Sequence, residues 1–169
     1  MNTSNERNIK LYNSPLELGI RGLVLLNVLR KSSSNQKNCD LNRLIIYDYI
    51  LLHSEDVEGP KSVHPPTPYR SGELLIKSDI LKKGLLLMKS KQLIEIVFDG
   101  SGISYAASDF ASPFLEYFDS QYYFDLKQTA KWVINRFNRY SDDELNSFIN
   151  NNINKWGSEF ANESLFFKA

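Results

Sequence analysis

The chain has 169 residues, of which 42% are hydrophobic and 24% charged, an ordinary composition for a globular protein with one sizeable core. Its 20 basic residues equal its 20 acidic ones, so net charge gives no support to nucleic-acid binding over the whole surface. The single cysteine, Cys39, excludes an internal disulfide and a cysteine-cluster metal site.

The N-terminus carries no sign of export. Its first residues, MNTSNERNIK, lack the apolar core of a signal peptide, and no apolar run approaches the roughly 20 residues that a membrane span needs. A lone cysteine also suits a reducing compartment. We therefore expect a cytoplasmic protein that makes no membrane contact, with a loose polar N-terminus over residues 1–13.

The first predicted helix is unusually apolar. Ser14 can cap it, Pro15 suits its first position and Glu17 completes a capping box, so the helix is predicted from there to about Arg30. Its apolar residues extend almost all the way round the helical wheel. This pattern predicts burial on most sides, and one explanation is a partner subunit on the far side.

A second helix, a connector and a third helix follow a polar loop. Asp40 caps the second helix, predicted over 41–53 and again apolar on most of its circumference. The connector over 54–71 is rich in proline. The third helix is predicted over 78–91, with Ser78 as its cap.

The predicted strands form one hairpin. The runs LIEIVF and ISYAA are rich in strand formers and DGSG between them supplies the turn, which places a hairpin over 93–107. Ser108 is then expected to start a fourth helix, and a fifth is predicted over 122–140. A second capping box, Ser141 to Glu144, opens a sixth.

This order predicts an α+β, mostly helical fold. Three helices, a two-stranded hairpin and a further helix correspond to a winged helix-turn-helix in which the third helix holds the recognition position and the hairpin is the wing. We expect a winged-helix domain over residues 14–118 and a C-terminal helical extension over 119–169 that packs on the same core.

The charges of two neighbouring segments favour different partners for such a fold. Residues 70–91 carry six basic and two acidic side chains, which favours DNA. Residues 92–126 carry six carboxylates and no Lys or Arg, so the predicted wing would repel phosphates. Leu86 falls in the middle of the polar face of the third helix, where it suits a protein partner better than base readout. Both partners remain open, as does a merely solvated lysine face.

Catalysis has little support in the sequence. GxSxG, Walker A, GxGxxG and HExxH motifs are absent, and Cys39 has no nearby histidine in sequence. His53 and His64 flank the acidic stretch SEDVE and could in principle bind a metal, but histidines in such positions more often hold a loop by hydrogen bonds. We expect no enzyme activity and no bound cofactor or metal.

The connector has features of a docking element. In EGPKSVHPPTPYRSGELL the prolines hold the backbone near polyproline geometry, which lowers the entropy cost of presenting it. Tyr69 and Arg70 follow directly, and both residue types are common interface hot spots. The alternative is a stiff loop that packs over its own core.

Several segments resemble the middle component of bacterial ABC three-component systems, also described as Lamassu antiphage defence. They are YNSPLELGIRGLVLL, LNRLIIYDYILLHSEDVEGPKSVHPPTPYRSGELLIK, GLLLM and FDGSGISYAASDFASPFLEYFDSQYY. The resemblance covers about Asn13 to Val133, and HSEDVEGPKSVHPPTPYRSGELL is its most specific part. Residues beyond about Phe137 show no motif.

The resemblance implies a small accessory subunit without catalytic residues. Such subunits work with an SMC-like ABC ATPase, which binds the ATP and senses foreign DNA, and with an effector, typically a nuclease. Their winged helices are similar to SMC-complex subunits that mainly contact protein. The strongest alternative is a stand-alone DNA-binding winged-helix regulator, and a metal-dependent enzyme that uses His53 and His64 is a third.

The candidate site residues belong to the connector and the third helix. The expected partner-binding residues are His53, Asp56, Gly59, Pro60, His64, Pro65, Pro66, Thr67, Pro68, Tyr69, Arg70, Ser71 and Leu86. The expected DNA contacts are Lys82, Lys83, Lys89 and Lys91.

Overall fold

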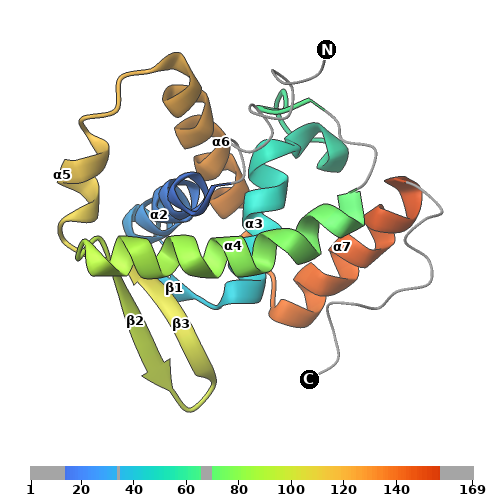
Figure 1. Cartoon of the computed structure of the whole chain (residues 1–169). Coiled ribbons are helices and arrows are strands. Elements are labelled where there is room, and N and C mark those ends of the chain that lie inside the picture. Colours follow the sequence, from blue (N-terminus) through green and yellow to red (C-terminus); the bar gives the residue numbers. More distant parts are fainter. Residues whose placement is uncertain (1–13, 34, 66–69, 157–169) are drawn as a thin grey trace.

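A computed structural model of the chain describes residues 14–33, 35–65 and 70–156. The fold is α+β and mostly helical, as the sequence predicts, and it has one small three-stranded antiparallel sheet (Figure 1). The elements in chain order are α2 (Pro15–Lys31), β1 (Asn38–Cys39), α3 (Leu41–Leu52), the 3₁₀ helix η1 (Ser54–Val57), α4 (Arg70–Ser90), β2 (Ile94–Asp99), β3 (Gly102–Ala107), α5 (Ala111–Leu115), α6 (Gln121–Phe137) and α7 (Asp142–Trp156).

Three helices begin where their capping residues predict. The side chain of Ser14 accepts a hydrogen bond from the backbone of Glu17 at 3.2 Å, and Asp40 accepts one from Arg43 at 2.8 Å. Before α7, Ser141 and Glu144 each accept a hydrogen bond from the other's backbone N–H, at 3.2 and 2.7 Å. These caps satisfy backbone donors that a helix start would otherwise leave unpaired.

Two predicted helix starts are wrong. Helix α4 begins at Arg70, so Ser78 lies inside it, because the intervening residues are mostly good helix formers and contain no proline. Ser108 caps no helix either, and α5 is confined to Ala111–Leu115. Instead Ser108 closes the base of the hairpin, where its hydroxyl donates to the backbone oxygen of Gln92 at 2.6 Å.

The predicted hairpin is confirmed, but it belongs to a larger sheet. Strands β2 and β3 pair antiparallel from Ile94 opposite Ala107 to Asp99 opposite Gly102. The two-residue strand β1, inside the stretch expected to be a loop, pairs with the other edge of β3 and gives the order β1-β3-β2. Figure 1 shows the far end of β2 and β3 projecting away from the helices.

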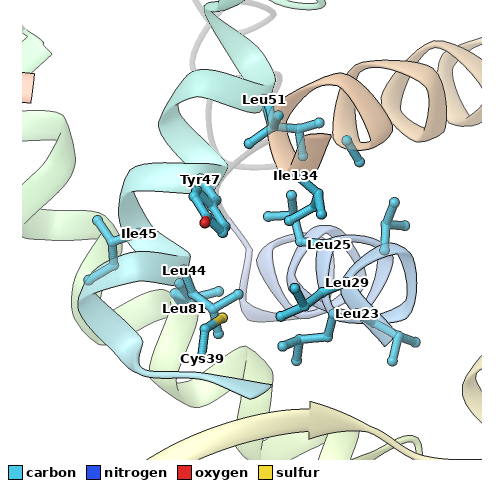
Figure 2. Packing of buried hydrophobic residues seen from close by; sticks show 14 of the residues in the cluster. Leu23, Leu25, Leu29, Cys39, Leu44, Ile45, Tyr47, Leu51, Leu81 and Ile134 are labelled. Carbon is cyan, nitrogen blue, oxygen red and sulfur yellow. The ribbon is translucent and has the colours of Figure 1, made fainter. Parts of the chain in front are cut away.

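Helix α2 lies at the centre of the core. It contacts α3, α4, α5, α6, β1 and β3, so its apolar circumference is buried by the chain itself. Figure 2 shows Leu25 and Leu29 of α2 lying among side chains of α3, with Ile134 of α6 nearby. The burial of α2 therefore needs no partner subunit on its far side, although Leu16 in its first turn is exposed.

The crossing of α2 and α4 depends on two glycines. A Cβ atom added to Gly19 would lie 2.6 Å from the backbone oxygen of Gly84, and one added to Gly84 would lie 2.6 Å from the backbone nitrogen of Gly19. The helices therefore touch backbone to backbone, an approach that only glycine at both positions permits.

Within the described ranges, no helix is both long and apolar enough to cross a lipid bilayer.

Candidate functional site

The described part of the connector is tied to its own chain. Gly59 donates its backbone N–H to the oxygen of Ser54 at 2.8 Å, and the Ser54 hydroxyl donates to the oxygen of Pro60 at 2.8 Å. Glu55 and Ser62 bond each other reciprocally: the Ser62 hydroxyl accepts from the backbone of Glu55 at 3.1 Å, and the Glu55 carboxylate accepts from that of Ser62 at 3.0 Å. The segment after α3 is thus a structured loop.

The candidate connector residues divide by exposure. His53 ends α3 and is only 3% exposed, with its ring 5.0 Å from that of Tyr49, so its side chain does not reach the surface. Asp56 is half-buried and accepts a hydrogen bond from the Tyr49 hydroxyl at 2.7 Å. Gly59 lies against Trp132, whose indole ring fills the space that a side chain at residue 59 would need. Pro60 and Pro65 are exposed.

The remaining candidate residues of the connector lie partly or wholly outside the described residues. Pro66, Thr67, Pro68 and Tyr69 lie outside the described residues. Arg70 and Ser71 form the first turn of α4, and their side chains lie outside the description.

A chain of polar side chains runs beneath the connector. His64 Nε2 lies 3.0 Å from the Tyr122 hydroxyl, which donates to Glu17 at 3.3 Å. Glu17 also accepts from Arg21 Nη1 at 3.0 Å. Arg21 in turn donates from Nε and Nη2 to the two carboxylate oxygens of Asp48, at 2.6 and 2.9 Å. We call these five residues the buried relay, and it joins the connector to α2, α3 and α6.

The charged groups of the buried relay stabilise one another. Arg21 is 0% exposed and Asp48 is 2% exposed. Burial would raise the pKa of Asp48, but Arg21 more than offsets this and lowers it below the ordinary value. Burial raises the pKa of Glu17 and also that of the Tyr122 hydroxyl. The result is a fixed ion pair between Arg21 and Asp48 with the neutral phenol of Tyr122 nearby. This arrangement stabilises the fold and orients the side chains of the relay.

We expect acid to destabilise the fold partly through His64. Burial lowers the pKa of His64 to about 4 from its ordinary 6.5, with a further contribution from the charge of Arg21. Between these values the unfolded chain binds a proton that the folded chain rejects, so stability falls as the pH falls through this window. Because the ring is only partly buried, we expect a loss of about 1–2 kcal/mol, measured by urea unfolding at about pH 7 and about pH 4.5.

His64→Gln is the matched control, since it cannot titrate but can still bond to Tyr122. It should flatten the pH dependence. The raised pKa of Glu17 acts in the opposite sense, because there the folded chain takes up the proton more readily. An equally steep decline in His64→Gln would show that other groups carry the effect.

The exposed side of α4 matches the sequence prediction. Lys82, Lys83, Lys89 and Lys91 are exposed, and Leu86 among them is 49% exposed. Residues 82, 86 and 89 are spaced to lie on one helix face, so this surface is basic with an apolar centre. Such a face is compatible with phosphates and with a protein.

Within the described residues, no three His, Cys, Asp or Glu side chains come together as metal ligands. The thiol of Cys39 is buried, and burial raises its pKa.

Sequence reasoning missed the buried relay, although two signals for it were present. Arg21 and Asp48 each interrupt a run of apolar residues in a helix predicted to be buried on most sides. Charged residues are almost never fully buried unless paired, so each implied an opposite charge somewhere in the core. Their pairing across 27 residues could not be read from spacing alone.

One comparison with known proteins identifies a family. Residues 11–159 match the family described as "ABC-three component (ABC-3C) system Middle Component 2". No curated protein and no solved structure gives a significant match. Because the match spans most of the chain, including the connector, the buried relay and the hairpin, this protein belongs to the Middle Component 2 family of ABC-three component systems.

Proposed function

We propose that this chain is a non-catalytic accessory subunit that bridges an SMC-like ABC ATPase and an effector of nuclease type in antiphage or antiplasmid defence. The observation that carries the proposal is the family match, because a middle component acts with other subunits by definition. The partner ATPase would bind the ATP, and this chain would need no cofactor. Its binding would hold the effector inactive until DNA engages the ATPase.

The fold supports a winged helix as the framework for this role. The order α2, β1, α3, α4, β2, β3 and the sheet order β1-β3-β2 support a winged helix-turn-helix, in which α4 would hold the recognition position. The short β1 strand supplies the third strand that closes the sheet against the core. Leu86, exposed on α4, favours a protein partner for the recognition position.

Co-expression with the neighbouring genes tests the bridging role. The tagged chain should be purified together with a large coiled-coil ATPase and an effector, and the mass of the assembly gives the stoichiometry. A free monomer or homodimer would contradict the proposal.

The docking residues need a separate test. We expect Tyr69→Ala together with Arg70→Ala to weaken the complex, because Tyr and Arg anchors commonly dominate interface energies. The matched control is Tyr117→Ala with Arg139→Ala, which removes the same residue types from exposed positions elsewhere. If the Tyr69 and Arg70 variant retains the complex at unchanged stoichiometry, these residues are not the docking anchors.

A DNA-binding regulator is the second candidate, favoured by three exposed lysines on α4 and by Lys91 directly after it. It predicts that the isolated chain binds duplex DNA with a steep salt dependence, and that Lys82→Ala with Lys83→Ala reduces both the affinity and the salt slope. A chain that fails to shift duplex DNA at low salt would eliminate this candidate.

A further inference from the structure

The apolar side of the hairpin continues beyond the core. Ile94, Ile96 and Phe98 alternate along β2 and therefore face the same side of the sheet. Their partners on β3 are Ala107, Tyr105 and Ile103. The inner pairs are buried or partly buried, whereas Phe98 is 73% exposed and Ile103 is 54% exposed.

This outer pair departs from the pattern expected of a solvated hairpin. A sheet face that projects into water is normally polar, and the opposite side of this hairpin does carry Glu95, Asp99 and Ser104. Phe98 and Ile103 are directly opposite each other in the register, so they form one continuous apolar surface. Figure 1 shows that the end of the hairpin lies away from the helices.

A pocket lies beside this surface. It has a volume of about 500 Å³, and its lining includes Ile94, Ile96 and Phe110, the last of which is 60% exposed. We define the wing face as Ile96, Phe98, Ile103 and Phe110. The hollow beside it has a mixed lining, since Lys89, Gln92, Glu95, Ser108 and Asp109 also contribute, so it suits a segment that carries charged side chains next to an apolar anchor.

The hairpin itself carries two carboxylates, Glu95 and Asp99, and no Lys or Arg, although both project from the side opposite Phe98 and Ile103. Glu95 and Asp109 line the pocket, and Asp99 lies in the turn next to Phe98. One cation, Lys89, also lines the pocket, and Arg30 pairs with Asp109. Residues 92–126 contribute no positive charge, since they contain no Lys or Arg. A partner should therefore surround its apolar contact with Lys or Arg, because complementary charge favours encounter and register.

We propose that the wing face docks another protein subunit of the system through a segment with an apolar anchor flanked by basic residues. This rests on the proposed function, since it requires that the chain assembles with other subunits. The two carboxylates of the hairpin, which has no Lys or Arg, oppose DNA as the occupant.

The test uses the full chain co-expressed with the products of its neighbouring genes. Phe98→Ser with Ile103→Thr should weaken capture of the partner subunit at least about tenfold in a titration, because apolar anchors at an interface centre carry much of the affinity. Glu95→Lys, which leaves the apolar pair intact, should weaken capture several-fold, with a larger effect at low salt. Both sites are exposed, so thermal unfolding of each variant should match the wild type.

The matched control is Leu16→Ser with Phe124→Ser, which removes two exposed apolar side chains of similar size from α2 and α6. It should leave capture unchanged. If the wild-type chain assembles and the Phe98 and Ile103 variant assembles equally well, the wing-face proposal is wrong while the proposed function stands. If the wild-type chain captures no subunit, the proposed function itself fails. A self-dimer that the same double variant abolishes would overturn the choice of occupant.

Discussion

Gly84→Ala is expected to lower the free energy of unfolding by about 2–4 kcal/mol, although alanine is the better helix former by about 1 kcal/mol. The new Cβ would lie 2.6 Å from the backbone nitrogen of Gly19 and closer still to the backbone oxygen of Pro15. Backbone atoms cannot rotate away as a side chain can. The two helices must separate, and every contact between them loosens.

A series of glycine variants tests whether the close backbone contact between α2 and α4 is the cause. Gly19→Ala should resemble Gly84→Ala, because its Cβ would meet the backbone of residue 84. Gly22→Ala should cost less, since its nearest neighbour is the side chain of Leu85 at 3.1 Å. Gly100→Ala, with nothing within 4 Å, should be nearly neutral. Chemical unfolding measures all four, and a Gly84→Ala chain as stable as Gly100→Ala would contradict the close crossing.

Removal of one partner from the buried ion pair should also be severe. We expect Asp48→Leu to cost about 3–5 kcal/mol, because it leaves the fully buried Arg21 without its bidentate partner. Arg21→Met should cost a similar amount by leaving Asp48 charged in the core. In Asp48→Leu, Glu17 keeps its hydrogen bond to Arg21 Nη1, but it does not replace the two hydrogen bonds that Asp48 accepts.

The double variant Arg21→Met with Asp48→Leu separates charge pairing from packing. Apolar side chains of similar volume often replace a buried pair at little net cost, so the double variant should be more stable than either single variant. The coupling energy follows from unfolding of all four chains in a double-mutant cycle. If the two single losses simply add, the residues do not act as a pair.

The glycine variants and the ion-pair variants both alter the scaffold that presents the proposed docking surfaces. The Gly19–Gly84 contact sets the position of α4, which carries Leu86 and the exposed lysines. The buried relay fixes His64 at the end of the described connector. A variant that weakens either should therefore loosen partner binding indirectly, which is why the wing-face test uses exposed residues.

The sequence by itself determined the features that depend on local chemistry. Ser14, Asp40 and Ser141 predicted helix starts correctly, because a cap acts on the residues that directly follow it. The hairpin followed from two runs rich in strand formers and the glycine-containing turn between them. The exposure of Leu86 followed from its place among lysines on a helical wheel.

Two serine residues gave wrong predictions of helix starts. Ser78 and Ser108 can cap helices, but neither does here, since a serine inside helical sequence need not stop a helix and a serine beside a hairpin can bond across its base.

Only the tertiary structure decided the features that join distant residues. Strand β1 is too short to show a period, and it exists because β3 offers it a free edge. The apolar circumference of α2 is covered by other elements of the same chain. The buried relay brings together residues 17, 21, 48, 64 and 122, and the exposed pair of the wing face is exposed only because no described helix covers the end of the hairpin. Burial and pairing across such separations depend on how the elements pack, which no local pattern records.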